Sequence, residues 1–91
     1  MNIVKPVMAG SLESSDALIS LNPSEDGARH LEVESIVIKQ YGKRIAAVAN
    51  EMLDAAGIKS GVMHIQDRGA LECTLRARIQ TALDREEKVS A

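Results

Sequence analysis

The stretch HLEVESIVIKQYGKRIAAVANEML, residues 30–53, contains the change of hydrophobic period that decides the fold. From His30 to Ser35 apolar residues alternate with polar ones, which is the pattern of a strand buried on one side. After Ser35, the expected N-cap, apolar residues recur every three or four positions, as in an amphipathic helix. This helix should end near Ala56, with Gly57 as the left-handed residue. Its apolar stripe is Val37, Tyr41, Ile45, Val48 and Met52, widened by Ala49 and Leu53.

Shorter signals lie on either side of this stretch. Ala17 to Leu21 is predicted to be a strand, and the turn-forming residues 22–27 predict that it forms a hairpin with the strand at 30–35. Val62 to Gln66 is predicted to be a third strand. A turn at Asp67-Arg68-Gly69 should then lead into a second helix. The apolar positions of that helix are Leu71, Leu75, Ile79, Ala82 and Leu83, with Cys73 expected to be partly buried beside them.

The resulting order, strand, strand, helix, strand, helix, predicts an α+β fold, a two-layer sandwich with two helices on one face of a small sheet. The 91 residues should form a single domain. Residues 1–16 are expected to be an extended or flexible segment, and residues 86–91 a frayed tail. Because packing consumes so small a core, no deep enclosed pocket is expected.

Composition restricts the function classes. Hydrophobic residues make up 45% of the chain and charged ones 26%, and the formal net charge is -2, with no basic stripe. Nucleic acid is therefore not an expected partner. The first ten residues lack the apolar core of a signal peptide, and no run reaches the ~18 apolar residues of a membrane span. We expect a cytoplasmic protein without membrane contact.

Residues able to do chemistry are few. His30 and His64 are the only imidazoles, and neither has a Cys or His at metal-ligand spacing. Cys73 is the only cysteine and is expected to behave as a small apolar residue. No metal site and no catalytic residue are predicted, so the chain is not expected to be an enzyme by itself. What remains is the hydroxyl-rich run from Ala9 to Asp16, which composition alone describes as a solvated loop.

Two motifs give a more specific indication. Gly10-Ser11-Leu12-Glu13-Ser14-Ser15-Asp16 and Asp67-Arg68-Gly69-Ala70-Leu71-Glu72-Cys73, the latter followed by Arg76-Ala77-Arg78, resemble the acyl carrier (gamma) subunits of bacterial citrate lyase in order and separation. The segment from Glu32 to Gly42 is also similar, so the resemblance covers most of the chain. In that family position 11 is often Thr, position 68 often Lys and position 41 often Phe.

The resemblance implies a carrier function. The first serine of Glu-Ser-Ser-Asp, here Ser14, would carry 2'-(5''-phosphoribosyl)-3'-dephospho-coenzyme A through a phosphodiester. The thiol of this arm would hold acetyl and citryl thioesters for the transferase (alpha) and lyase (beta) subunits. A prosthetic-group transferase would attach the arm and an acetate ligase would acetylate it, so recombinant protein made without them would be the apo form. Glu13, Ser15 and Asp16 are then candidates for partner recognition, and Asp67, Arg68 and Gly69 for partner contact.

Three alternatives stay open. A malonate decarboxylase carrier would share the arm type, although the two motifs favour citrate lyase. A histidine phosphocarrier is also a small α+β domain, but it should place its histidine at a helix N-terminus, where amide groups receive the phosphate. A ligand-sensing or interaction module would give the N-terminal serines no role.

Overall fold

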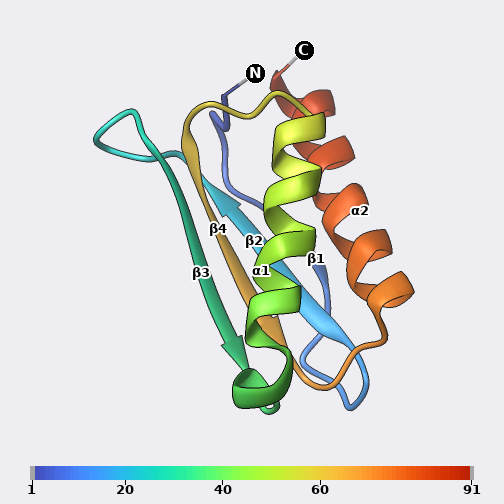
Figure 1. Cartoon of the computed structure of the whole chain (residues 1–91). Helices are drawn as coiled ribbons and strands as arrows, with labels where there is room; N and C mark the ends of the chain where they lie inside the picture. Colours follow the sequence, from blue (N-terminus) through green and yellow to red (C-terminus); the bar gives the residue numbers. More distant parts are fainter. Residues whose placement is uncertain (1, 91) are drawn as a thin grey trace.

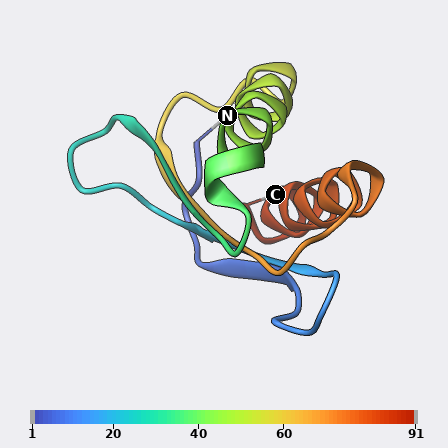
Figure 2. The same cartoon turned by 60° about the horizontal axis from the view of Figure 1, so that its bottom comes forward.

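The computed structural model describes residues 2–90. Four strands form one mixed sheet, and both helices cover the same face of it (Figures 1 and 2). The predicted α+β class is confirmed, and the order gains one strand at its start. In chain order the elements are β1 (Val7–Gly10), β2 (Ala17–Asn22), β3 (Arg29–Ser35), α1 (Ile38–Ala55), β4 (Gly61–Asp67) and α2 (Glu72–Ser90).

The additional strand, β1, lies within the segment expected to be extended or flexible. It pairs antiparallel with β2, from Val7 opposite Leu21 to Gly10 opposite Leu18. Residues 7–10 are thus extended, but they belong to the sheet. Four residues are too few for alternation to be visible in the sequence, because only Val7 and Ala9 of this strand pack against the core, the latter with 2% of its surface exposed. Met1, at the start of that segment, lies outside the described residues.

The predicted hairpin between β2 and β3 is wrong. The strand order is β1-β2-β4-β3, so β4 lies between them. It pairs antiparallel with β2 and parallel with β3, and α1 provides the crossover that a parallel pair requires. On the face toward the helices, β4 buries Met63 and Ile65, which are at most 1% exposed. Residues 23–28 do form a loop after β2, but it leads to the far edge of the sheet instead of a neighbouring strand.

The helix α1 follows its predicted stripe over most of its length. Ile45 and Leu53 are buried, whereas Tyr41, at 56% exposed, is not. The helix begins at Ile38 instead of directly after Ser35, although the Ser35 hydroxyl accepts a hydrogen bond from the backbone N–H of residue 37 at 3.0 Å. At the other end Gly57 has a φ of 69°, so the predicted left-handed residue after the helix is confirmed.

The C-terminal tail does not fray where the sequence predicted it. The helix α2 continues through residues 86–90, and Ala91 lies outside the described residues. Glu86 is fully buried, and its Oε1 accepts hydrogen bonds from the backbone N–H groups of Val4, at 2.8 Å, and Lys5, at 3.2 Å. A buried carboxylate on the last helix therefore holds the segment that precedes β1. The polar composition of residues 86–91 gave no sign of this, because the partners are backbone groups from the other end of the chain.

This contact gives a first prediction. Glu86→Ala should lower the free energy of unfolding by about 1 to 3 kcal/mol, because it leaves two backbone donors without their acceptor. Urea unfolding measures the loss, and amide exchange at Val4 and Lys5 should become faster. Lys88→Ala, an exposed site on the same helix, is the control. Equal stability of the two variants would contradict the role given to Glu86.

Candidate functional site

The loop of residues 11–16 joins β1 to β2 and carries Ser14 at one end of the molecule, opposite the end where Glu86 holds the N-terminal segment (Figure 1). The N–H of Asp16 donates to the carbonyl of Glu13 at 3.2 Å, closing a tight turn with Ser14 and Ser15 at its centre. Both central serines and Glu13 are exposed. We call residues 11–16 the serine loop.

Backbone geometry fixes the shape of this loop. Gly10, just before it, has a φ of 92°, and a Cβ there would come within 1.8 Å of the carbonyl oxygen of Ala17. A glycine is thus required for the chain to leave β1 at this angle. Ser15 has a φ of 63°, the only positive value at a non-glycine residue among those described. The third position of a turn often needs such a value, which serine adopts at some cost in strain.

The carboxylate of Asp16 organises the serine loop from within. It accepts hydrogen bonds from the Ser11 hydroxyl at 2.7 Å and from the Ala17 N–H at 2.7 Å. The Arg78 guanidinium, on α2, holds it with two donors, at 2.8 and 3.2 Å. These contacts, led by the hydrogen bond from Arg78, hold the pKa of Asp16 well below its usual range. The ion pair of Asp16 with Arg78 therefore attaches the end of the serine loop to α2.

The turn between β4 and α2 holds the serine loop from its other side. The Ser15 N–H donates to the carbonyl of Arg68 at 2.9 Å, and the Arg68 N–H donates to the carbonyl of Asp16 at 2.9 Å. This reciprocal pair fixes the loop against residues 67–69. The side chain of Arg68 remains exposed.

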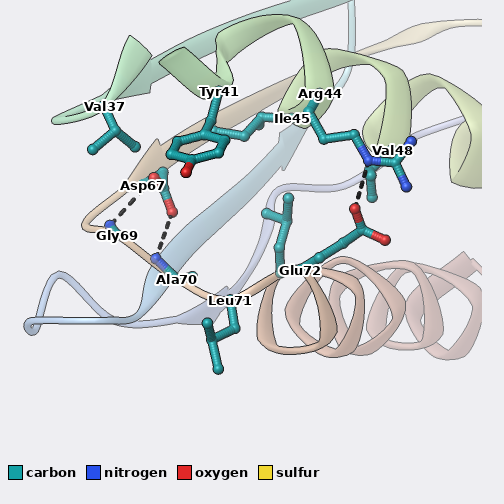
Figure 3. Close-up of a pocket in the computed structure, with 11 residues that line it drawn as sticks. Val37, Tyr41, Arg44, Ile45, Val48, Asp67, Gly69, Ala70, Leu71 and Glu72 are labelled. Atoms are coloured by element: carbon teal, nitrogen blue, oxygen red, sulfur yellow. Dashed lines mark hydrogen bonds and ion pairs between the residues drawn. The ribbon is translucent and has the colours of Figure 1, made fainter. Parts of the chain in front are cut away.

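Asp67 in turn determines the shape of this second turn. Its side chain is 4% exposed and accepts hydrogen bonds from the Gly69 N–H at 3.2 Å and the Ala70 N–H at 3.0 Å (Figure 3). The Ser35 hydroxyl donates to the same carboxylate at 2.7 Å. Gly69 has a φ of 85°, as a turn at this position needs. The turn that Asp67 shapes also holds Arg68, whose backbone bonds to Ser15 and Asp16 bring the two sequence motifs into direct contact.

A groove of about 390 Å³ opens beside this turn, between α1 and the start of α2 (Figure 3). No deep enclosed pocket was expected, and the groove is open to solvent, since Tyr41 on one side is 56% exposed and Leu71 on the other 71%. Arg44 lies at its rim, with Nε 2.5 Å from Glu72 Oε1. The lining residues are Val37, Tyr41, Arg44, Ile45, Val48, Asp67, Gly69, Ala70, Leu71, Glu72 and Leu75.

Two expectations about the second helix are corrected here. Leu71 precedes α2 and is exposed, so it belongs to the groove instead of the apolar stripe. Cys73 is exposed as well, not partly buried. The helix begins at Glu72, and its core contacts are made from Leu75 and Ile79 onward.

The histidines lie away from the serine loop. His30, on β3, is 2.8 Å from Asp26, and His64, on β4, is 2.6 Å from Glu34, on the sheet face that no helix covers. Neither imidazole lies at a helix N-terminus, so the geometry of a histidine phosphocarrier is not found in residues 2–90. The described residues also contain no group of three potential metal ligands, and no helix among them is long and apolar enough to cross a membrane.

Sequence reasoning found the serine loop and the 67–69 turn but missed the residues that hold them. Arg78 belongs to the second motif, but the sequence gives it no role, because its partner Asp16 is 62 positions away. Asp16 and Asp67 were proposed to face partners, yet both carboxylates bind groups of this chain. In the serine loop and the 67–69 turn themselves, the charged side chains that remain exposed are Glu13 and Arg68.

Comparison with known proteins defines the class. The family model described as "ACP: Malonate decarboxylase delta subunit (MdcD)" matches residues 4–86. A chain in the crystal structure of a Pseudomonas malonate decarboxylase hetero-tetramer has the same fold, with a TM-score of 0.74 over 90% of this chain and 84% of that chain, at 17% sequence identity. The match places this chain in the class of small acyl carrier proteins.

Curated relatives narrow the class. Citrate lyase acyl carrier proteins of Escherichia fergusonii and Rhodopseudomonas palustris are each 46% identical over 93% of this chain, and cover 88% and 87% of their own lengths. That of Clostridium perfringens is 44% identical over 99% of this chain and 89% of its own length. The chain therefore belongs to the family of citrate lyase acyl carrier proteins.

The ion pair of Asp16 gives a prediction with a defined sign. Because the pKa of Asp16 is depressed in the folded state, its stabilisation is complete above the ordinary value of 3.8 and is lost as the pH falls toward the folded-state value. Asp16→Asn should have a lower free energy of unfolding than the unsubstituted chain at pH 7, and this difference should shrink below pH 3.8. Urea unfolding from pH 7 downward measures it, with Glu13→Gln on the same loop as control. A difference independent of pH would rule out the ion pair as its source.

Proposed function

We propose that this chain is the acyl carrier subunit of a citrate lyase and that Ser14 carries the phosphoribosyl-dephospho-coenzyme A arm through a phosphodiester. When bound, the arm supplies the thiol on which acetyl and citryl groups are carried. The observation that supports this most is the position of Ser14. It is an exposed hydroxyl at the centre of a turn whose two sides are held by hydrogen bonds to the rest of the chain.

The geometry favours Ser14 over its neighbours. Ser11 is partly buried, and its hydroxyl donates to Asp16 while accepting from the N–H of Glu13 at 3.2 Å. Ser15 is exposed, but its N–H anchors the turn to Arg68 and its backbone is left-handed. A bulky substituent on Ser14 would leave all of these contacts intact.

The chain's own residues have a mechanical task in this proposal. Asp16, Arg78 and Arg68 keep the attachment point at a fixed place on a rigid domain, so that the motion is confined to the arm. Tethering gives the carried group an effective concentration of the millimolar order at each partner's active site. A covalent carrier of this kind needs a hydroxyl in an accessible position and no catalytic group of its own.

The partners in this proposal are the transferase and lyase subunits, the prosthetic-group transferase and the acetate ligase. Each must approach the end of the molecule that holds Ser14. Glu13 and Arg68, exposed beside Ser14 with opposite charges, are candidates for this recognition. Asp67 and Gly69 contribute by shaping the turn that presents Arg68.

A malonate decarboxylase carrier is the second candidate, because the matching family model is described by that subunit and the structural neighbour comes from that enzyme. The sequence favours citrate lyase. Identity is 44–46% to citrate lyase carriers, compared with 17% to the malonate decarboxylase chain. Citrate cleavage and malonate decarboxylation by the complex isolated from the native host separate the two.

Modification of Ser14 can be tested by intact mass. Protein co-expressed with its attaching enzymes should gain the mass of the arm, located at Ser14 by peptide sequencing, and Ser14→Ala should gain nothing. Ser15→Gly is the matched control, because it removes the neighbouring hydroxyl and tolerates the positive φ. Ser15→Gly protein should carry the arm to the same extent as protein without a substitution. An arm found on Ser15 in the Ser14→Ala protein would overturn the assignment.

Counting thiols tests whether Cys73 has a chemical role. Because Cys73 is exposed, native apo-protein should titrate one thiol and deacetylated holo-protein two. Cys73→Ala holo-protein should keep one, and its stability should change by no more than about 0.5 kcal/mol, as at other surface sites. Alkylation of the remaining thiol should abolish citrate cleavage by the reassembled complex. If Cys73→Ala protein carries its arm, assembles and fails to support turnover, Cys73 takes part in the chemistry.

A further inference from the structure

The groove beside the 67–69 turn exposes the chain's only aromatic residue. Tyr41 is 56% exposed and Leu71, opposite it, 71% exposed. Single exposed apolar residues are ordinary in small domains, whereas several that gather on one surface often mark a binding site. Of the eight exposed large hydrophobic residues within residues 2–90, five belong to segments that meet at this end: Leu12, Ile36, Ile38, Tyr41 and Leu71.

The size of the groove fits part of a small molecule. Its volume of about 390 Å³ lies in the lower part of the range of ligand sites, and its lining is mostly apolar with a few polar groups at the rim. The floor is formed by side chains of the core, including Ile45, Val48 and Leu75, so the groove is a fixed feature of the fold.

The groove begins where the serine loop is anchored. Arg68, whose carbonyl accepts the Ser15 N–H at 2.9 Å, lies between Asp67 and Gly69, which both line the groove. A group attached to Ser14 therefore starts next to the turn that forms one wall. Its effective concentration there is of the millimolar order, so weak contacts are sufficient to hold it.

The chemistry of the rim matches a nucleotide. A base stacks on an exposed aromatic face, and Tyr41 presents one to the groove (Figure 3). Arg44 uses Nε for Glu72, and its guanidinium has further N–H donors in the fork that suits phosphate oxygens. The pair with Glu72 is exposed, with 59% and 43% of the two side chains accessible, so it yields readily to another anion.

We propose that this groove holds the adenine nucleotide of the chain's own arm, with the base against Tyr41 and the phosphates facing Arg44, whenever no partner subunit holds the arm. The inference depends on the proposed attachment at Ser14. It adds a resting site for the arm on the carrier itself, distinct from the attachment point.

Tyr41 supplies its own reporter, because the protein's intrinsic fluorescence comes from this residue alone. Apo-protein and holo-protein, the latter verified by mass to carry the arm on Ser14, are compared without partner subunits. With a dissociation constant near the effective concentration, about half of the molecules hold the nucleotide, and tyrosine emission should fall by up to about half. The Tyr41 ring protons should shift upfield, and the amides of Gly69 to Leu71 should also shift.

Two variants distinguish binding of the nucleotide in the groove from an effect of the arm on another part of the protein. Arg44→Gln should leave apo emission unchanged and bring holo emission back toward the apo value. Lys43→Gln removes the same charge from the neighbouring exposed residue of α1, outside the groove, and should have no effect. Free dephospho-coenzyme A, added to apo-protein at millimolar concentration, should produce the same shifts at Tyr41 and Gly69 to Leu71.

The outcomes distinguish this inference from the proposed function. Holo-protein with the arm on Ser14 but with apo-like Tyr41 signals would overturn the resting site and leave the carrier function intact. Absence of any arm would refute the carrier function itself. A Tyr41 change in apo-protein that grows with protein concentration would assign the groove to a second copy of the chain. A change in holo-protein seen only with partner subunits would assign it to them.

Discussion

The buried carboxylate of Asp67 is the contact on which this end of the molecule depends. It binds the hydroxyl of Ser35 at the end of β3 and two amides of the turn that leads into α2. A buried carboxylate left without these donors would be costly, so the three segments are held in one arrangement. That arrangement positions Arg68, which in turn bonds to the serine loop. A single buried side chain thus links the core of the sheet to the surface where chemistry is proposed.

Hydrophobic spacing and turn residues in the sequence predict those features of the fold that depend on neighbouring residues. The change from alternation to helical spacing after Ser35 located β3 and α1, because burial on one side imposes these periods on any sequence. Gly57 and Gly69 were predicted as turn residues, because few other residues accept a positive φ. The serine loop was recognised from a motif, since its composition alone described only a solvated loop.

Contacts between distant segments could not be predicted in this way. Strand alternation says which face is buried but not which strand is the neighbour, so the place of β4 between β2 and β3 was missed. The sequence predicts a frayed tail at Glu86 and no role for Arg78, because their partners lie 81 or 82 and 62 positions away. Tyr41 continues the stripe of α1, yet its ring lines the open groove beside the start of α2 and is 56% exposed.

The central position of β4 has a consequence for how the protein is made. Among the described strands, β1 and β2 pair across a short loop, whereas β3 pairs with β4 alone, and α1 separates these two along the chain. During synthesis the chain can therefore form at most a two-stranded hairpin and an isolated helix until residues 61–67 have left the ribosome. Such fragments are marginally stable in water. Folding of this carrier is thus delayed until β4 has been made, and an enzyme that reaches Ser14 earlier meets at most a marginally stable hairpin.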